Sequence, residues 1–284
     1  MKNKRVCFVE VECISPSGNK QLKRLDGLAI KGTVSRKAGT VQAEASVSIA
    51  NLTKPTLEYL TTYTTPYFNP KTKKRINIYA GYEDTGWGQI FSGDIIEAIP
   101  QNMPDVWLNV KAKSLYYNQR VPISYGVGNV SMRELAQSIA NELNLPLDWQ
   151  AESVKNIAGF DLIGSKGDLI KEYNKLGGVI MFEDNGKLKV IDKNAQPPAG
   201  NKAKLISLHT GLIGDFEPDQ YGIKGKCLID PSMKLGDWIK TESIKLPGTN
   251  GYYRIYTLDF DFASREQQFY CKFYGRTSTN YYAQ

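Results

Sequence analysis

The sequence predicts a mainly β protein with a small α+β domain in the middle of the chain. Short β-prone runs separated by turn residues fill the first 115 residues and return after residue 200. Between them, residues 131–191 form the only stretch that is clearly helical. We therefore expect three domains: antiparallel β domains at 1–115 and 201–284, and a central α+β insert at 116–200.

The first helix of the insert is predicted to start after Ser131. Ser131 and Glu134 have the spacing of a capping box, in which each side chain bonds the backbone of the other residue. Apolar residues then recur at helical intervals as far as Leu143. Asn144 and Pro146 follow, so the helix is expected to end there.

The second helix and a hairpin follow directly. Ser165 is a suitable N-cap, Asp168 lies in the first turn, and Gly177-Gly178 is expected to stop the helix. Residues 179–191 then contain two short β-prone runs around Asn185-Gly186, a pair that suits the positive φ angles of a tight turn. The insert is therefore predicted to end in a β-hairpin.

The flanking segments predict strands rather than helices. In the strand predicted at 5–14 the odd-numbered residues should face inward, and a short helix is expected at 53–60. Residues 61–74 look like a long exposed loop, and residues 192–202, with Pro197-Pro198, look like a linker. About six strands in the first segment suit a barrel or a sandwich. The remaining predicted strands are 28–33, 41–49, 75–81, 89–96, 106–112, 205–210, 221–229, 238–243, 251–262 and 267–274.

Composition excludes several classes of protein. The chain has 284 residues, 41% of them hydrophobic and 23% charged, which is ordinary for a packed protein. No apolar run approaches the ~18 residues of a transmembrane helix, and acidic residues interrupt the N-terminus before a signal-peptide core could form. We expect no membrane span and no export by the general secretory route.

Cofactor and metal sites are not predicted. The single histidine, His209, excludes multi-histidine metal sites, and the four cysteines contain no CxxC pair. Nucleotide-binding glycine motifs and hydrolase motifs are absent from the sequence. We therefore expect no cofactor and no catalytic residue.

Two carboxylates could still support a hydrolase. Asp259 and Asp261 lie two residues apart and would share one face of a strand, and paired carboxylates carry out glycoside hydrolysis. The simpler interpretation is that alternation places polar residues on the wet face of a sheet. The paired carboxylates nevertheless leave a peptidoglycan or glycan hydrolase open as one hypothesis for the function.

Contact residues are predicted in two places. The net charge is +7, and its clearest concentration is the run Lys71 to Arg75. The aromatic strand near the C-terminus could pair with another chain if it lies at a sheet edge. The predicted interface residues are Lys71, Lys73, Lys74, Arg75, Phe269, Tyr270, Lys272, Phe273 and Tyr274.

Four stretches in this order resemble the baseplate hub proteins of contractile-tailed bacteriophages. They are AGYEDTGWGQIFSGDI at 80–95, SMRELAQSIANELNL followed by SKGDLIKEYNKLGGVIMFEDNGKLKVID, HTGLIGDFEPDQYGIKGKCLIDPSMKLGDWIKTES at 209–243, and GYYRIYTLDFDFASREQQFYCKFYG at 251–275. The resemblance covers most of the chain.

The resemblance implies two antiparallel tail-tube-like β-barrels flanking the central insert, in a homotrimer that forms a ring of six barrels. Such a pseudo-six-fold ring would join the tail tube to the central spike and enclose the channel for genome passage. The implied partners are further copies of the chain, the tail tube protein, the spike or cell-puncturing protein, other baseplate proteins and the tape measure.

The resemblance also sets the expected location and chemistry. DNA would pass through the ring transiently without specific binding, and the protein would reside in the virion tail baseplate after assembly in the host cytoplasm. The family offers no catalytic residue. The first of the four stretches would also fit a non-hub tail-tip adaptor of the distal tail kind, and the excess of basic residues would fit a nucleic-acid-binding module.

Overall fold

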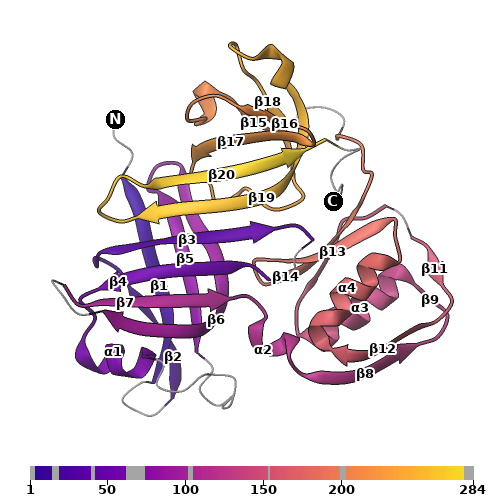
Figure 1. The fold of residues 1–284 in the computed structure, drawn as a ribbon, viewed down its shortest axis with the longest axis horizontal. Coiled ribbons are helices and arrows are strands. Elements are labelled where there is room, and N and C mark those ends of the chain that lie inside the picture. The colour runs from indigo at the N-terminus through magenta and orange to yellow at the C-terminus, as the bar shows by residue number, and fades with distance from the viewer. Residues whose placement is uncertain are drawn as a thin grey trace.

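The computed structural model describes residues 4–14, 19–39, 42–61, 74–101, 105–152, 154–198 and 203–277, and strands dominate them (Figure 1). The mainly β prediction is therefore confirmed. The helices are α1 (Lys54–Leu60), α2 (Tyr116–Gln119), α3 (Met132–Leu143) and α4 (Lys166–Lys175), with 3-10 turns η2 (Leu208–Thr210) and η3 (Pro247–Thr249). The strands are β1 (Arg5–Ile14), β2 (Lys20–Leu25), β3 (Ile30–Lys37), β4 (Glu44–Ala50), β5 (Arg75–Tyr82), β6 (Gly86–Gln101), β7 (Trp107–Lys113), β8 (Pro122–Val127), β9 (Val130–Ser131), β10 (Leu147–Trp149), β11 (Asn156–Ile157), β12 (Phe160–Ser165), β13 (Val179–Asp184), β14 (Lys187–Asp192), β15 (Lys204–Ile206), β16 (Glu217–Asp219), β17 (Gly222–Leu228), β18 (Trp238–Thr241), β19 (Gly251–Ala263) and β20 (Phe269–Arg276).

The two β-rich segments share one sheet. Its 13 strands follow the order β16-β17-β20-β19-β3-β4-β7-β6-β5-β1-β2, with β18 and β15 attached beside β19. The segments join where β19 pairs antiparallel with β3, from Thr257 opposite Lys37 to Ala263 opposite Lys31. Figure 1 shows β20, β19, β3, β4 and β7 as successive ribbons, with β1 and β5 behind. Among the described residues the ladders form this open path, and no closed barrel is seen.

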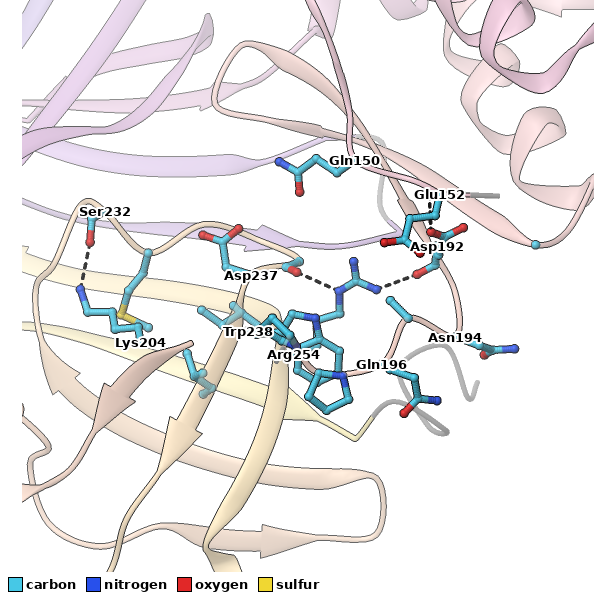
Figure 2. Close-up of a pocket in the computed structure, with 18 of the residues that line it drawn as sticks. Gln150, Glu152, Asp192, Asn194, Gln196, Lys204, Ser232, Asp237, Trp238 and Arg254 are labelled. Atoms are coloured by element: carbon cyan, nitrogen blue, oxygen red, sulfur yellow. Dashed lines mark hydrogen bonds between the residues drawn. The ribbon is translucent and has the colours of Figure 1, made fainter. Parts of the chain in front are cut away.

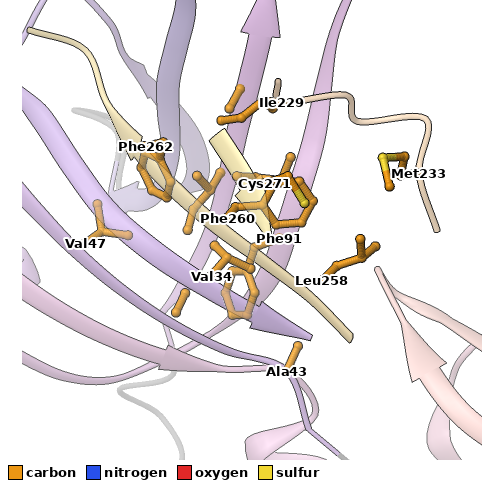
Figure 3. Packing of buried hydrophobic residues seen from close by; sticks show 14 of the residues in the cluster. Val34, Ala43, Val47, Phe91, Ile229, Met233, Leu258, Phe260, Phe262 and Cys271 are labelled. Carbon is orange, nitrogen blue, oxygen red and sulfur yellow. The ribbon is translucent and has the colours of Figure 1, made fainter. Parts of the chain in front are cut away.

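One hydrophobic core also serves both segments. Buried residues of the first segment, such as Val34 and Phe91, belong to the same cluster as Phe260 and Cys271 of the last segment (Figure 3). Phe91 and Phe260 are both almost wholly removed from solvent. Burial of an aromatic side chain contributes roughly 1.5–3 kcal/mol, so the shared core binds the two ends of the chain together.

The central insert has its own smaller core under α3 and α4. α3 begins with the predicted capping box of Ser131 and Glu134, and α4 begins at the predicted N-cap Ser165, whose backbone N–H and hydroxyl donate to Asp168. Asn144 adopts a left-handed conformation at the end of α3, with φ of 54°. The two helix predictions are confirmed, although α4 ends at Lys175, just before the glycines.

The β13–β14 hairpin lies between the two cores. Its Asn185-Gly186 turn has φ angles of 54° and 84°, as predicted. Val179 and Met181 point into the core of the insert, whereas Ile180 and Phe182 belong to the shared core of the sheet. Because successive side chains of a strand point to opposite faces, both faces of β13 are buried. The hairpin therefore attaches the insert to the sheet.

Several local predictions differ from the structure. Residues 115–125 contain α2 and the start of β8, which pairs with β12, and neither element is among those predicted above. The strand predicted at 205–210 is only β15 followed by η2. In β1, Val9 and Val11 face inward as expected, but Phe8 is also buried, because the Tyr79 ring stacks on it at 4.6 Å and the Arg24 guanidinium lies 3.7 Å from its centre. Most of the predicted 61–74 loop lies outside the described residues.

Candidate functional site

One face of the continuous sheet is polar from β17 to β6. Side chains that alternate with the core residues point to this face, and every one of them is half-buried or exposed. We call it the polar face. Its polar members are Lys31, Thr33, Ser35, Lys37, Glu44, Ser46, Ser48, Glu97, Asn109, Lys111, Lys113, Lys224, Lys226, Thr257, Asp259, Asp261, Tyr270, Lys272 and Tyr274. The exposed apolar side chains Ile99 and Leu228 lie among them, opposite Asn109 and Tyr270.

The strand register arranges the polar face in rows that run across the strands. One row passes directly from Lys226 through Lys272, Asp259, Ser35 and Glu44 to Lys113. It crosses the β3–β19 junction without interruption. The two β-rich segments therefore present one surface, in which the last strands of the chain continue the pattern set by the first.

Most charges of the polar face are paired with a neighbour. Lys113 contacts Glu44 at 2.6 Å, Lys111 contacts Glu97 at 2.7 Å, and the Lys272 ammonium lies 3.0 Å from Asp261. The remaining acid, Asp259, accepts a hydrogen bond of 2.6 Å from the hydroxyl of Ser35. Neighbouring opposite charges cancel at distances beyond the Debye length of about 10 Å. This surface is hydrophilic, and its ion pairs reduce the excess of its seven lysines over its four acidic residues.

Tyrosine and lysine side chains interlock at the β17 end of the polar face. The Lys226 ammonium lies 3.8 Å from the centre of the Tyr270 ring, and Tyr274 donates a hydrogen bond of 2.6 Å to Asp219. That bond, with others from Lys224 and the backbone of Tyr221, lowers the pKa of Asp219 to about 2. Burial and the same carboxylate raise the pKa of Tyr274 to about 12. Both groups therefore keep their ordinary charge near neutral pH.

A groove of about 930 Å³ separates the insert from the last β segment (Figure 2). Arg254 crosses it: Nε donates to the carbonyl of Gly236 at 2.8 Å, and Nη1 donates to the carbonyl of Asp192 at 2.6 Å. Nearby, the buried ammonium of Lys189 donates to the carbonyl of Leu235 at 2.8 Å. These bonds tie β14 to the turn before β18, so we assign the residues of the groove to holding the insert in place.

Of the four predicted basic contact residues, two lie among the described residues. Lys71 and Lys73 lie outside the described residues. The Lys74 ammonium donates to the carbonyl of Tyr59 and lies 4.8 Å from the centre of its ring, so it is engaged within the chain. Arg75 is exposed at the start of β5. Their role in an interface stays a prediction.

The aromatic strand, β20, does not lie at a sheet edge. Its predicted pairing with another chain required an edge strand, so that condition is not met. β20 is bonded on one side to β17 and on the other to β19, so its backbone groups are already used. Phe269 and Phe273 point into the core. Tyr270, Lys272 and Tyr274 point to the polar face. The outer strands of the described path are instead β16 and β2.

The candidate catalytic and metal-binding residues do not assemble into a reactive site. Asp259 and Asp261 do share one face, but a side chain from a neighbouring strand engages each of them. His209 is exposed in η2. Within the described ranges, no group of three or more His, Cys, Asp or Glu residues could hold a metal ion. None of the helices in the described part of the chain has the length and apolar composition needed to cross a bilayer.

The fold matches solved structures of phage tail proteins. The 43 kDa tail protein of prophage MuSo2 from Shewanella oneidensis is 7% identical, with a TM-score of 0.63 over 97% of this chain and 99% of that one. The tail protein from Neisseria meningitidis MC58 is 9% identical, with a TM-score of 0.65 over 97% and 98%. The E. coli c3393 protein, a component of the type VI secretion system, is 11% identical, with a TM-score of 0.62 over 92% and 77%. A comparison with curated protein sequences gives no match.

The fold is thus that of tail proteins from phages and related secretion systems. At these low identities the likeness shows the fold alone. The family is given by the sequence itself: residues 8–275 match the model of the family described as Baseplate hub gp41. The chain belongs to this family of structural phage baseplate proteins, which confirms the resemblance seen in the four sequence stretches.

Proposed function

We propose that three copies of this chain form a ring that joins the tail tube to the central spike of a phage baseplate. The single observation that supports this best is the β3–β19 junction, because it makes two β-rich segments present one continuous polar face. Three such chains would supply six similar segments, which suits a pseudo-six-fold ring against a six-fold tube. Each chain would be divided into tube-like barrels at 1–115 and 201–284 with the insert at 116–200.

We assign the polar face to the lining of the channel. DNA carries one negative charge per about 1.7 Å of helix axis, and an unpaired basic surface would bind it tightly. The paired charges of the polar face avoid this, since Lys111, Lys113 and Lys272 already have acidic neighbours. The genome would then pass during ejection without specific binding.

The partners follow from the position of the ring. The tube protein would contact one end and the spike the other, with the tape measure and other baseplate proteins nearby. Structures similar to this chain include a PdpA–VgrG complex described as lidless, which matches with a TM-score of 0.61 over 98% of this chain and 65% of that one. Assembly would take place in the host cytoplasm before the tail is completed.

The oligomeric state is the direct test. Light scattering coupled to size-exclusion chromatography should give three times the 31.8 kDa mass of the chain, at protein concentrations in the micromolar range. Electron micrographs of the same fraction should show three-fold or pseudo-six-fold rings with an open centre. A monomer at high concentration, both alone and after mixing with tube and spike proteins, would refute the proposal.

A hydrolase and a distal tail adaptor receive less support. A hydrolase would need free carboxylates, but Ser35 and Lys272 engage Asp259 and Asp261. A peptidoglycan zymogram that shows clearing by the wild-type protein but not by a D259N/D261N double variant would revive it. The distal tail adaptor is disfavoured because the family match is to a hub.

A further inference from the structure

The tip of the β13–β14 hairpin carries a group of charged side chains that are almost wholly buried. Glu183 and Asp184 end β13 and are 4% and 6% exposed, although turn residues are usually solvated. Opposite them, Arg36 of β3 is 3% exposed. Charged residues of these types are almost never buried to this extent unless they are paired. The tip therefore lies inside the molecule, against the first β segment.

Each side chain at the tip has a partner in a different strand of the sheet. The guanidinium of Arg36 forms an ion pair with Asp184. Ser114, just after β7, donates a hydrogen bond of 2.5 Å to Glu183. Asn185 donates to the carbonyl of Gln89 in β6 at 3.0 Å, and the Gln89 amide returns a bond of 3.2 Å. The tip thus engages β3, β6 and the end of β7 together.

Of the two carboxyl groups at the tip, Glu183 has no cationic partner among the described residues. Among the described residues, Arg36 is the cation in direct contact, and Asp184 takes it. Glu183 accepts only neutral donors, from Ser114 and from the backbone N–H of Gly186 at 2.7 Å. Of the other strands packed here, β6 contributes the neutral Gln89 and the buried Asp94, while the nearest lysine of β7, Lys113, pairs with Glu44 on the polar face. Within the hairpin, β14 contributes Lys187, which lies opposite Asp184 in the ladder and is exposed to solvent.

An unpaired charge at this depth is costly, whereas a neutral carboxylic acid is not. Burial and, to a smaller extent, the adjacent Asp184 raise the pKa of Glu183, and the Ser114 and Gly186 bonds and Arg36 only partly oppose this. A protonated carboxyl can keep the Gly186 bond and can itself donate to the Ser114 hydroxyl. The hairpin tip fits best against the sheet when Glu183 carries a proton.

We propose that the β13–β14 hairpin is a proton-dependent latch, which holds the insert on the sheet while Glu183 is neutral and loosens when Glu183 ionises. The direction follows from linkage: a carboxyl group that binds its proton more tightly in the latched state stabilises that state at low pH. This contribution falls as pH rises from the ordinary value of a glutamate, 4.5, toward the raised value in the latched state. The inference does not depend on the ring or on its partners.

The test is the pH dependence of hydrogen exchange at residues 183–187, measured by mass spectrometry on the whole chain and corrected for the intrinsic exchange rate. In the wild type, the fraction of open hairpin should grow by up to about tenfold per pH unit within this window. Glu183→Gln keeps the size of the side chain and cannot ionise, so its corrected exchange should be flat. The matched control, Glu172→Gln, changes a residue of α4 paired with Lys175 at the surface and should follow the wild type.

A second variant tests the charge argument. In Asp184→Asn, Arg36 loses its own partner and becomes available to Glu183, which brings the pKa of Glu183 in the latched state closer to its ordinary value. The rise in opening should therefore level off at a lower pH and be smaller than in the wild type. A merely structural role would change the extent of opening equally at every pH. If Glu183→Gln does not fold, infrared spectroscopy of the wild type provides a second test. The carbonyl band of a protonated carboxylic acid should be present in the latched state and should disappear over the same pH range in which the hairpin opens. Equal pH profiles for the wild type and Glu183→Gln, or an unchanged pH profile in Asp184→Asn, would overturn the proposal.

Discussion

The β3–β19 junction depends on a glycine, and replacing it is a direct test of the fold. Gly32 lies in β3 between β19 and β4, with its hydrogen side toward the core. A Cβ atom at this position would meet the backbone carbonyl of Ser46 and would lie 3.0 Å from both Phe262 Cζ and Val47 Cα. Two of these neighbours are backbone atoms in a hydrogen-bonded ladder, so they cannot swing aside. Gly32→Ala must therefore push β3 away from β4.

Overpacking of this kind costs about 1–3 kcal/mol. With a urea slope of about 3 kcal/mol per M, the denaturation midpoint should fall by roughly 0.3–1 M. The control is Gly128→Ala, because a Cβ there meets no atom within 4 Å and its φ is not left-handed. Its free energy of unfolding should stay within the ~0.5 kcal/mol expected of a surface change. If both variants unfold at the same urea concentration, β3 is not confined as described.

Three further outcomes follow from individual side chains. Phe260→Ala removes a wholly buried ring from the shared core and should lower the free energy of unfolding, measured in urea, by about 3–5 kcal/mol. A loss below about 1 kcal/mol would mean that this core is not continuous. Hydrogen bonds from Ser165 and Lys171 lower the pKa of Asp168 to about 2. The stability that this carboxylate adds is therefore complete above its ordinary pKa of 3.8 and is lost as pH falls through about 2. In urea titrations, Asp168→Asn should destabilise the chain at neutral pH and have a smaller effect at a pH of about 2. Tyr274 should ionise with a pKa of about 12 in ultraviolet titration, and Asp219→Asn should bring this pKa closer to the ordinary 10.0 by removing the adjacent charge, so an unchanged titration would exclude this contact.

Local signals in the sequence predict the elements that depend on local chemistry. The helix from Met132 to Leu143 and its capping box are predictable because both partners of the cap lie within one turn. The Asn185-Gly186 turn is predictable for the same reason, since it depends on which residues tolerate positive φ. Even the family resemblance rests on stretches of continuous sequence.

The arrangement of the sheet cannot be predicted in the same way. Pairing of β3 with β19 joins strands that are distant in sequence, and nothing in the sequence of either strand indicates which strand it pairs with. The apolar run Val179 to Phe182 does carry a signal, because it does not alternate with polar residues, which is typical of a strand buried on both faces. Glu183 and Asp184 carry none: in sequence they are ordinary turn residues, and burial of a turn is decided by what packs on it.

The ladder between β3 and β19 has a consequence for biosynthesis. Ser35 and Asp259, bonded across it, are 224 residues apart in sequence. During translation β3 therefore leaves the ribosome long before its partner exists, and its open edge can meet the same edge of a neighbouring nascent chain. Until the C-terminal strands are made, dilution of the nascent chains or chaperone binding to β3 would reduce such pairing between chains.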